Sequence, residues 1–406
     1  MNTAVLGDRS LFPDLRVLAY LNHAAISPLS LPARQAAERA IADLAQAGSV
    51  AFPERLFERQ KLRDDLARLL GADSDEIALV PSTGYGLAAL ATSFPWRRGA
   101  RVIVFAGEYP TNVSVWQQAC ARHALQLTML PVADLARPDA ADFSALEREL
   151  RRGDVQLCAA STVQFQTGLR MPIERMAELC HAHGAQLAVD AVQGLGSVPL
   201  DVRALGVDYA AAGSHKWLMG ADGAGVLFIK AEHLPQLAPS VAGAFSHIDA
   251  ELIFAQAGQL RYDRGLRSDA RVFEGGMLSS ISLSTLSASV PILLGLGVER
   301  IYAHVNTYLD ALEAGLLERG FHSLRLADAA RRSCILGVQL PAAAGVSASR
   351  FATELVTRGV ICSAPDAVLR FAPHFHCGLA EVSHVLAAID DVLAQLRSGR
   401  GTDPRS

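Results

Sequence analysis

The sequence predicts an α/β protein with a large N-terminal domain, in which a mostly parallel sheet lies between helices, and a smaller C-terminal α+β domain. Short apolar runs alternate with helical spacing through the first half of the chain, as is typical of parallel strands buried on both faces. Polar residues follow several of these runs directly. The length of 406 residues is enough for two domains.

The elements of the large domain follow in order. Apolar residues recur at helical spacing from Leu31 to Leu70, and residues 112–124 predict a further helix. A turn at residues 220–223 precedes the last apolar run, which predicts a hairpin-like strand. The runs that we expect to form strands are residues 77–80, 101–105, 156–160, 185–190, 207–212 and 225–229.

The second half of the chain begins with an irregular connection. Residues 241–270 hold several glycines and show little periodicity, which predicts a long loop of the kind that is usually functional. A long helix is expected from about Ser284 to Gly320, with a break near Gly295 or Gly297. The smaller domain is completed by strands at 335–340, 360–362 and 368–371 and by helices at 347–358 and 379–397.

These elements divide the chain into four parts. We expect an N-terminal arm at residues 1–19 and the large domain at residues 20–270. The small C-terminal domain then covers residues 271–397. Residues 398–406 are polar and are expected to form a disordered tail.

Composition and charge exclude several classes of protein. A hydrophobic content of 50% with 19% charged residues indicates a globular protein. The formal net charge of −4 argues against a nucleic-acid partner. No segment has the pattern of a signal peptide or a membrane span, so we expect a cytoplasmic protein without a membrane partner. The six cysteines show no CxxC pair and no zinc spacing, which favours free thiols and no metal site.

One lysine occupies a position with chemical meaning. The chain contains three lysines, and Lys216 is the one that follows an apolar run, within the stretch G-S-H-K-W at residues 213–217. Asp190 ends the preceding apolar run. Pyridoxal phosphate (PLP) chemistry requires such a pair, because a lysine forms a Schiff base with the cofactor aldehyde and a carboxylate keeps the pyridine nitrogen protonated. PLP is therefore the expected cofactor, and Lys216 and Asp190 are the expected catalytic residues.

Other polar residues occupy the same kind of position. Thr83, Tyr109 and Gln164 come shortly after predicted strands, as Asp190 and Lys216 do. In parallel sheets, ligands bind beyond the carboxyl ends of the strands. The five side chains are therefore expected to meet at one edge of the sheet.

The chain resembles the class V aminotransferase group of fold-type I PLP enzymes in two blocks of sequence. These are V-D-A-V-Q at residues 189–193 and A-G-S-H-K-W-L-M-G at residues 212–220, with G-A-G following at 223–225. The group includes cysteine desulfurases, selenocysteine and cysteine lyases, isopenicillin N epimerase-like proteins and some transaminases. The resemblance runs from about residue 20 to residue 396, and it implies that Lys216 also moves the proton at the substrate Cα.

The resemblance implies further contacts to PLP. Asp190 would pair with the pyridinium nitrogen, Gln193 would hydrogen-bond the phenolic oxygen, and His215 would contact the phosphate. Thr83 and Gly84 would hold the phosphate with backbone N–H groups at a helix N-terminus. Tyr109 stands where desulfurases stack a histidine on the pyridine ring.

Further positions depart from the pattern of the group, and one of them is Gly84, which stands where the group often has a second threonine. Gly213 replaces a serine that binds the phosphate, and Ser214 is a candidate to stand in for it. Phe165 aligns with an asparagine that touches the cofactor oxygen, and Gln164 or Gln166 is a candidate substitute.

The resemblance also implies contacts to the substrate and to a second subunit. Arg370 matches an arginine that binds the substrate α-carboxylate, a role that suits its planar, bidentate guanidinium. Asn22 and His23 match an N-terminal segment that folds over the site. The resemblance implies a homodimer, in which a threonine of one subunit reaches the phosphate bound by its partner. Met277 occupies the position of that threonine here, so this contact is not expected.

The sequence narrows the choice among the PLP-dependent reactions of amino acids. Desulfurases need a mobile cysteine before the carboxylate arginine, whereas here a short segment separates Cys362 from Arg370, and Cys377 lies beyond the arginine. We therefore favour an aminotransferase or a β-eliminating lyase acting on a small α-amino acid. A desulfurase or an epimerase of the same fold remains an alternative, as does a non-catalytic protein with this fold. A dinucleotide-binding oxidoreductase is disfavoured, because Pro199 stands where the third glycine of the fingerprint should fall.

Overall fold

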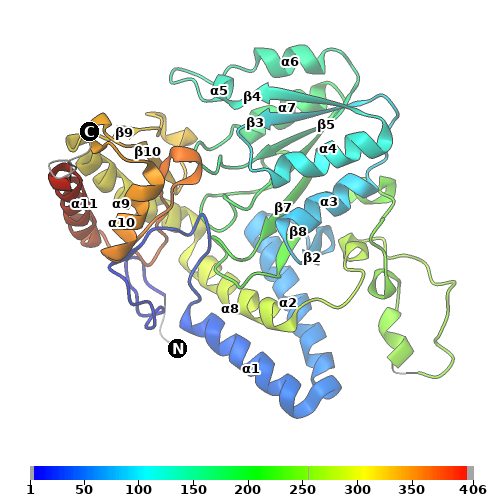
Figure 1. The fold of residues 1–406 in the computed structure, drawn as a ribbon. Coiled ribbons are helices and arrows are strands. Elements are labelled where there is room, and N and C mark those ends of the chain that lie inside the picture. The colour runs from blue at the N-terminus through cyan, green and yellow to red at the C-terminus, as the bar shows by residue number, and fades with distance from the viewer. Residues whose placement is uncertain (1–3, 255, 400–406) are drawn as a thin grey trace.

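The structure, a computed structural model, describes residues 4–254 and 256–399. A seven-stranded sheet with the order β2-β8-β7-β6-β5-β3-β4 forms the interior of its larger part (Figure 1). The strands from β7 to β4 in this order are parallel to one another, and β8 is antiparallel to both of its neighbours. The strands are β2 Ile77–Val80, β3 Arg101–Ala106, β4 Gln126–Pro131, β5 Val155–Ser161, β6 Gln186–Asp190, β7 Tyr209–Gly213 and β8 Gly225–Ile229.

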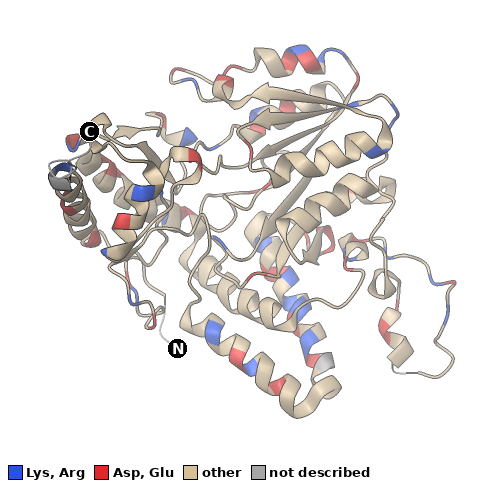
Figure 2. Cartoon of the chain, viewed as in Figure 1, with Lys and Arg blue, Asp and Glu red and all other residues tan. Residues whose placement is uncertain are grey.

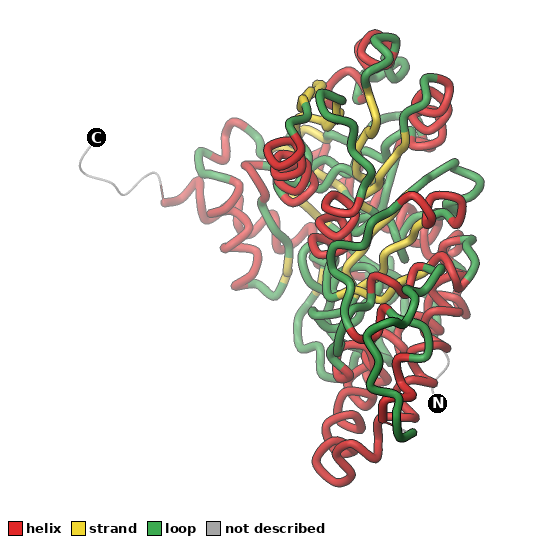
Figure 3. Tube along the Cα trace, turned by 90° about the vertical axis from the view of Figure 1, so that its right-hand side faces the viewer, coloured by secondary structure: helices red, strands yellow, loops and turns green. Residues whose placement is uncertain are grey.

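Apolar side chains on both sides of the strands bury both faces of this sheet. In β3, Ile103 and Phe105 pack into one apolar core, whereas Val102 and Val104 pack into another. Helices α3 and α4 contribute to the second core, and α2, α7 and α8 contribute to the first. Turning the molecule by 90° shows the strands inside and the helices around them (Figure 3). The predicted α/β fold is confirmed.

Eleven α-helices occur in the described residues, and two of the predicted helical stretches are broken. Gly48 ends α1 with a φ of 52°, which glycine adopts readily, and Pro53 lies in the first turn of α2. The helical spacing from Leu31 to Leu70 therefore belongs to two helices. The helices are α1 Leu31–Ala47, α2 Phe52–Leu70, α3 Thr83–Ser93, α4 Thr111–His123, α5 Val132–Leu135, α6 Ser144–Leu150, α7 Ile173–Ala182, α8 Ser280–Leu296, α9 Val298–Glu318, α10 Ala348–Thr357 and α11 Glu381–Gly399.

The second break falls at Gly297, one of the two positions expected. Its φ of 80° ends α8, and α9 leaves at an angle of 80°. Together these two helices reach the length and hydropathy of a membrane span, but they do so only as a bent pair. No single helix within residues 4–254 and 256–399 is long and apolar enough to cross a membrane.

The N-terminal segment joins the C-terminal part of the chain to the large sheet. β1 pairs in parallel with β11, and Asn22 forms a bridge to Ala372. Farther along, Ser27 donates its N–H to the carbonyl of His215, next to the lysine. The predicted domain boundaries at residues 19 and 270 stay predictions. The remaining strands, of which β9, β10 and β12 form an antiparallel sheet, are β1 Ala19–Tyr20, β9 His322–Ser323, β10 Leu336–Gln339, β11 Val360–Ile361 and β12 Leu369–Phe371.

The sequence pattern predicted one of two further segments and missed the other. β4 was not predicted, because most of its side chains are exposed or half-buried at the edge of the sheet, and its sequence lacks an apolar run. The irregular connection was predicted correctly. Residues 241–254 and 256–277 form a long excursion, which includes the predicted connection and has short 3-10 turns at Ala244–Ser246 and Ala250–Phe254 (Figure 1).

Candidate active site

A cavity of about 460 Å³ lies beyond the carboxyl ends of β2, β3, β6 and β7. Ligands of parallel sheets bind at this edge, where strand ends and helix N-termini meet. The C-terminal part of the chain contributes Pro365 and Arg370 to the wall. Eight of the twelve predicted site residues line the cavity: Thr83, Gly84, Tyr109, Asp190, Gln193, His215, Lys216 and Arg370.

Lys216 and Asp190 are two of the ionisable groups that line the cavity. Burial lowers the pKa of the Lys216 amino group to about 8, although the charge of Asp190 opposes this. Burial raises the pKa of the Asp190 carboxyl to about 7, although the N–H of Val192 donates to its Oδ1 at 3.0 Å. Near neutral pH, both groups can therefore change their protonation state at little cost, as general acids and bases must.

The N-terminus of α3 forms one end of the cavity. The first N–H groups of a helix have no partner within the helix, and the N–H of Tyr85 is satisfied by the Ser82 hydroxyl. The N–H groups of Thr83 and Gly84 are thus available to an anion, which the helix dipole also favours. Gly213 donates its N–H to the Thr83 hydroxyl oxygen at 2.8 Å, which fixes that side chain.

Two glycines keep this end of the cavity open. A Cβ on Gly213 would lie 3.1 Å from the imidazole of His215, so a serine at residue 213 would crowd that ring. A Cβ on Gly84 would lie 3.2 Å from Cγ2 of Thr111, which also lines the cavity. The side chain of Thr111 therefore occupies the space into which a side chain at residue 84 would point.

Gln193 is held by two bonds that orient its amide. Its Nε2 donates to the Ala24 carbonyl at 2.9 Å, and its Oε1 accepts from the indole N–H of Trp217 at 2.9 Å. An amide nitrogen carries two N–H groups, so one remains for a ligand in the cavity. The contact to Ala24 also attaches the N-terminal segment to the site.

Aromatic rings and a guanidinium form the opposite side of the cavity. The Nζ of Lys216 lies 5.5 Å from the centroid of the Tyr109 ring, and Tyr109 packs edge-on against Phe165. Arg370 donates to the Phe165 carbonyl at 2.7 Å and to the Ser363 hydroxyl at 3.1 Å. These bonds leave its Nη2 without a partner among the described residues, and burial lowers its pKa only to about 10, so it remains a cation.

Four predicted site residues lie outside the cavity. The amide oxygen of Gln164 accepts from residues 166 and 167, and its nitrogen donates to Gly107, so the side chain stabilises its own loop. Ser214 is fully buried and its hydroxyl donates to the Ala221 carbonyl, so it is not placed to replace the missing serine at 213. Asn22 and His23 do not line the cavity, whereas the next two residues, Ala24 and Ala25, do.

His23 belongs to a group of buried aromatic rings rather than to the cavity. Its ring packs against Trp217 and contacts His374 and His376. His374 Nε2 bonds the Trp217 carbonyl at 3.0 Å, and His376 Nε2 lies 3.4 Å from His23 Nε2. Burial lowers the pKa of His374 to about 4 and that of His376 to about 3, so these rings are neutral.

The cysteines lie away from the chemistry. All six are buried and free, and no cysteine in the described ranges lines the cavity. Burial raises the pKa of Cys362 and of Cys377 to about 12, so both are thiols. Cys377 contacts the Tyr20 carbonyl, and its place in the protein interior gives it a packing role.

Several lining residues were not predicted as site residues. Ser82, Thr111 and Phe165 belong to segments that the sequence marked, but their side chains carried no separate signal. Ala24 and Ala25 line the cavity because the N-terminal segment lies across it. That contact is between residues far apart in the chain, and periodicity does not reveal it.

The fold and the site define an α/β enzyme with a half-buried lysine, Lys216, and a buried carboxylate, Asp190, in one cavity. The model of the family described as aminotransferase class V matches residues 48–375, most of the chain. The chain therefore belongs to the class V aminotransferase family, whose members depend on PLP.

Individual relatives cover nearly the whole chain. An uncharacterized aminotransferase, YcbU, from Bacillus subtilis is 28% identical over 95% of this chain and 97% of its own length. A probable cysteine desulfurase from Chlamydia muridarum is 29% identical over 83% of this chain and 84% of its own length. A solved complex of the cystine C–S lyase C-DES with cysteine persulfide matches with a TM-score of 0.84 and 22% identity, covering 94% of this chain and 99% of that one. This last likeness shows the fold.

Proposed function

We propose that this protein is a PLP-dependent enzyme that acts on a small α-amino acid with an uncharged side chain, as an aminotransferase or a β-eliminating lyase. The observation that carries the proposal is the convergence of Lys216, Asp190, Gln193, the α3 N-terminus and Arg370 on one cavity. Each has a free polar group or a titratable group, and each would suit a different part of a cofactor–substrate pair.

The residues fit PLP at three separate points. Thr83 and Gly84 offer N–H groups for a phosphate, and Asp190 offers a carboxylate that a ring N–H⁺ would keep ionised. Lys216 offers the amine for the aldehyde. A solved structure of C-DES, which has the same fold, holds glycine linked covalently to PLP. When bound, PLP supplies a ring that accepts electrons from the substrate Cα.

The chain's own residues would then control the proton and the carboxylate. Lys216 is an amine with a pKa near 8, so it can take a proton from Cα and return it to a neighbouring atom. Arg370 presents a free Nη2 and a positive charge for the substrate carboxylate. The ring of Tyr109 lies beside the Lys216 amine and forms part of the cavity wall.

The wall near Arg370 supports an uncharged substrate side chain. Phe165, Pro365 and Val192 are apolar, and Arg370 is the one arginine that lines the cavity among the described residues. A second carboxylate on the substrate would find no second guanidinium there. Burying such a charge without a partner is costly, so acidic amino acids should be poor substrates.

Cysteine desulfuration is the rival reaction within the family, since several relatives carry that name. The chemistry needs a cysteine that reaches the substrate sulfur. Cys362 is buried and its pKa is raised to about 12, and the segment that follows it is short. Elimination or amino transfer requires no such nucleophile, and we therefore favour these two reactions.

We also propose that the enzyme is a homodimer. The excursion at 241–277 and the joined ends of α1 and α2 expose large apolar side chains, which a monomer would leave in water. A second copy of the chain would cover them. The most exposed are Val50, Phe57, Phe254, Leu260, Tyr262 and Met277.

A panel of amino acids tests the reaction. Purified protein is incubated with each amino acid, with and without 2-oxo acid acceptors, and products are separated. Amino transfer that depends on the acceptor identifies an aminotransferase, whereas 2-oxo acid and ammonia formed without an acceptor identify a lyase. The purified protein should show a visible absorbance band from the cofactor, and borohydride should bleach it. The absence of such a band would contradict the proposal.

A further inference from the structure

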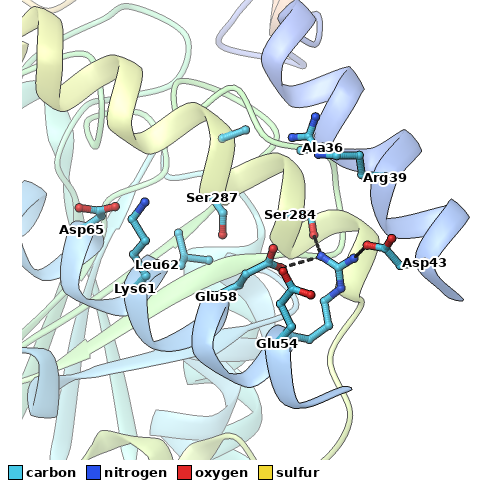
Figure 4. A pocket seen from close by; sticks show the side chains of 12 residues that line it. Ala36, Arg39, Asp43, Glu54, Glu58, Lys61, Leu62, Asp65, Ser284 and Ser287 are labelled. Atoms are coloured by element: carbon cyan, nitrogen blue, oxygen red, sulfur yellow. Dashed lines mark hydrogen bonds and ion pairs between the residues drawn. The ribbon is translucent and has the colours of Figure 1, made fainter. Parts of the chain in front are cut away.

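Two arginines one turn apart on α2 differ in how their charges are balanced. Arg55 and Arg59 are 7% and 8% exposed. Arg55 donates to Glu58 at 2.6 Å and pairs with Asp43. Asp43, Glu58 and Ser284 face one another between α1, α2 and α8 (Figure 4).

Arg59 has no such partner. Its single hydrogen bond within the described residues goes from Nη2 to the Leu278 carbonyl at 3.2 Å, and no carboxylate there lies within ion-pair distance. Burial lowers its pKa, and the carboxylate of Glu274 offsets this only in part. A buried guanidinium without a counter-charge is costly, so such groups are normally paired.

Arg59 lines a pocket of about 160 Å³ between α2 and the excursion at 241–277. Basic side chains recur along α2 (Figure 2), and the excursion adds Arg267 and Arg271 to the pocket. The other arginines of the pocket are paired. Arg63 bonds both oxygens of Glu274, Arg267 pairs with Glu251, and Arg271 pairs with Asp269.

The balance of charge in the pocket therefore leaves one cation. Four arginines line the pocket, and three carboxylates pair with them: Glu251 and Glu274 in the pocket and Asp269 outside its lining. The unpaired group is Arg59. The volume is too small for a folded segment of another protein but is sufficient for a tetrahedral anion. Guanidinium groups bind phosphate and sulfate oxygens through two parallel hydrogen bonds.

We propose that this pocket binds a small tetrahedral oxyanion, phosphate or sulfate, through Arg59. The site is distinct from the α3 N-terminus, because the two cavities share no lining residue. It is also independent of the proposed reaction, since it involves none of the residues placed in that chemistry.

The position of the pocket gives the anion a structural consequence. The two ends of the excursion touch at Gly243 and Gly275, where a Cβ on Gly243 would lie 2.1 Å from the Gly275 carbonyl. Gly276, the next residue, lines the pocket opposite α2. An oxyanion bound there would join the base of the excursion to α2, and would stabilise the loop that carries Met277.

Thermal unfolding of the PLP-loaded enzyme tests the proposal, because the cofactor then occupies the phosphate site at α3. Midpoints are measured in potassium phosphate, potassium sulfate and potassium chloride at equal ionic strength. We expect the midpoint to rise with phosphate or sulfate along a binding curve, but not with chloride. Isothermal titration of Arg59→Met with phosphate should show binding that is about tenfold or more weaker, because one charged hydrogen-bonding group is lost.

Two further variants keep the result interpretable. Arg68→Met lies on the same helix with its side chain 69% exposed, and it should retain the full phosphate response. Arg59→Lys keeps the charge without the fork and should bind phosphate with intermediate affinity, and it replaces Arg59→Met should that variant not fold. Equal phosphate responses in wild type and in the Arg59 variants would overturn the proposal. The proposal would also be overturned if neither phosphate nor sulfate raised the unfolding midpoint. A midpoint that depends on Arg59 and rises with protein concentration, and not with the oxyanion, would overturn it as well.

Discussion

Two groups of buried titratable side chains lie on either side of Trp217, and only one of them has the properties of an active site. On one side, Lys216 and Asp190 face a cavity. On the other, His23, His374 and His376 pack against one another and against the indole ring or its backbone. Lys216 is half-buried and the other four side chains are buried, and burial shifts the pKa values in both groups.

The difference lies in where the polar atoms point. The ring nitrogens of the histidines contact each other, backbone carbonyls, the N–H of Phe375 and the thiol of Cys377, so each of them has a partner within the protein. In the cavity, Gln193, Arg370 and the α3 N-terminus each keep a donor for which the described residues offer no acceptor. Shifted pKa values therefore mark burial in both places, whereas unused donors around a cavity mark the site.

Removal of the lysine should have the largest effect. Lys216→Ala is expected to lose borohydride-reducible cofactor and to lower kcat by at least about 10²–10⁴-fold, the usual contribution of a general acid–base group. Lys230→Ala is the matched control, because Lys230 lies on the surface in an ion pair with Glu232. Cofactor-dependent turnover that survives in Lys216→Ala would assign the chemistry to another amine.

Arg370→Lys should have the next largest effect. Lysine keeps the positive charge but cannot present two parallel N–H groups, and it also leaves the Phe165 carbonyl without its donor. We expect KM for the amino acid to rise, so that kcat/KM falls by the equivalent of about 2–5 kcal/mol. The visible spectrum of the cofactor should stay unchanged. Arg350→Lys, on the exposed face of α10, is the control. An unchanged KM would show that Arg370 does not bind the substrate carboxylate.

The group of His23, His374 and His376 should affect how the stability of the fold depends on pH, and not how the enzyme binds its substrate. Histidines in the unfolded chain take up protons below about pH 6.5, whereas His376 stays neutral in the folded protein down to a pKa of about 3. The unfolded state therefore binds more protons in this window, and stability falls as the pH falls from 6.5 towards 3.

His376→Phe should reduce that loss by up to about 1.4 kcal/mol per pH unit, measured by denaturant unfolding between pH 4 and 6.5. At neutral pH, we expect it to leave KM unchanged and to cost about 1–3 kcal/mol of stability, because His23 loses a partner. His384→Phe, at an exposed position of α11, is the control. A raised KM with an unaltered acid slope would place His376 in the site.

The sequence predicted the parts of the fold and site that depend on local pattern. Asp190 and Lys216 were found because each follows an apolar run, and buried parallel strands all show such runs. The break at Gly297 and the irregular excursion were also visible, since glycine and lost periodicity are local signals. β4 was missed because an exposed edge strand need not be apolar.

The rest depends on contacts between distant residues. Resemblance to the family suggested that Ser214 would face the phosphate and that His23 would be near the substrate, but only the packed chain shows where each side chain points. Ser214 turns to Ala221, and His23 turns to His376. The unpaired state of Arg59 has the same origin, because the sequence of α2 does not reveal which carboxylates lie opposite.

The smallest effect is expected from Cys362, the cysteine that precedes Arg370 in the sequence. Cys362→Ala should change kcat/KM by less than about twofold, below 0.5 kcal/mol in barrier height. The thiol is 6% exposed, burial raises its pKa to about 12, and it does not line the cavity, so it can neither ionise readily nor reach a substrate. Incubation with cysteine, followed by intact mass measurement, should show no persulfide on the wild-type protein. Cys120→Ala, on α4, controls for the loss of a buried thiol. A sulfur adduct that appears on wild type and disappears only in Cys362→Ala would mean that this segment moves and that the protein is a desulfurase, because only a mobile cysteine could carry sulfur out of the site.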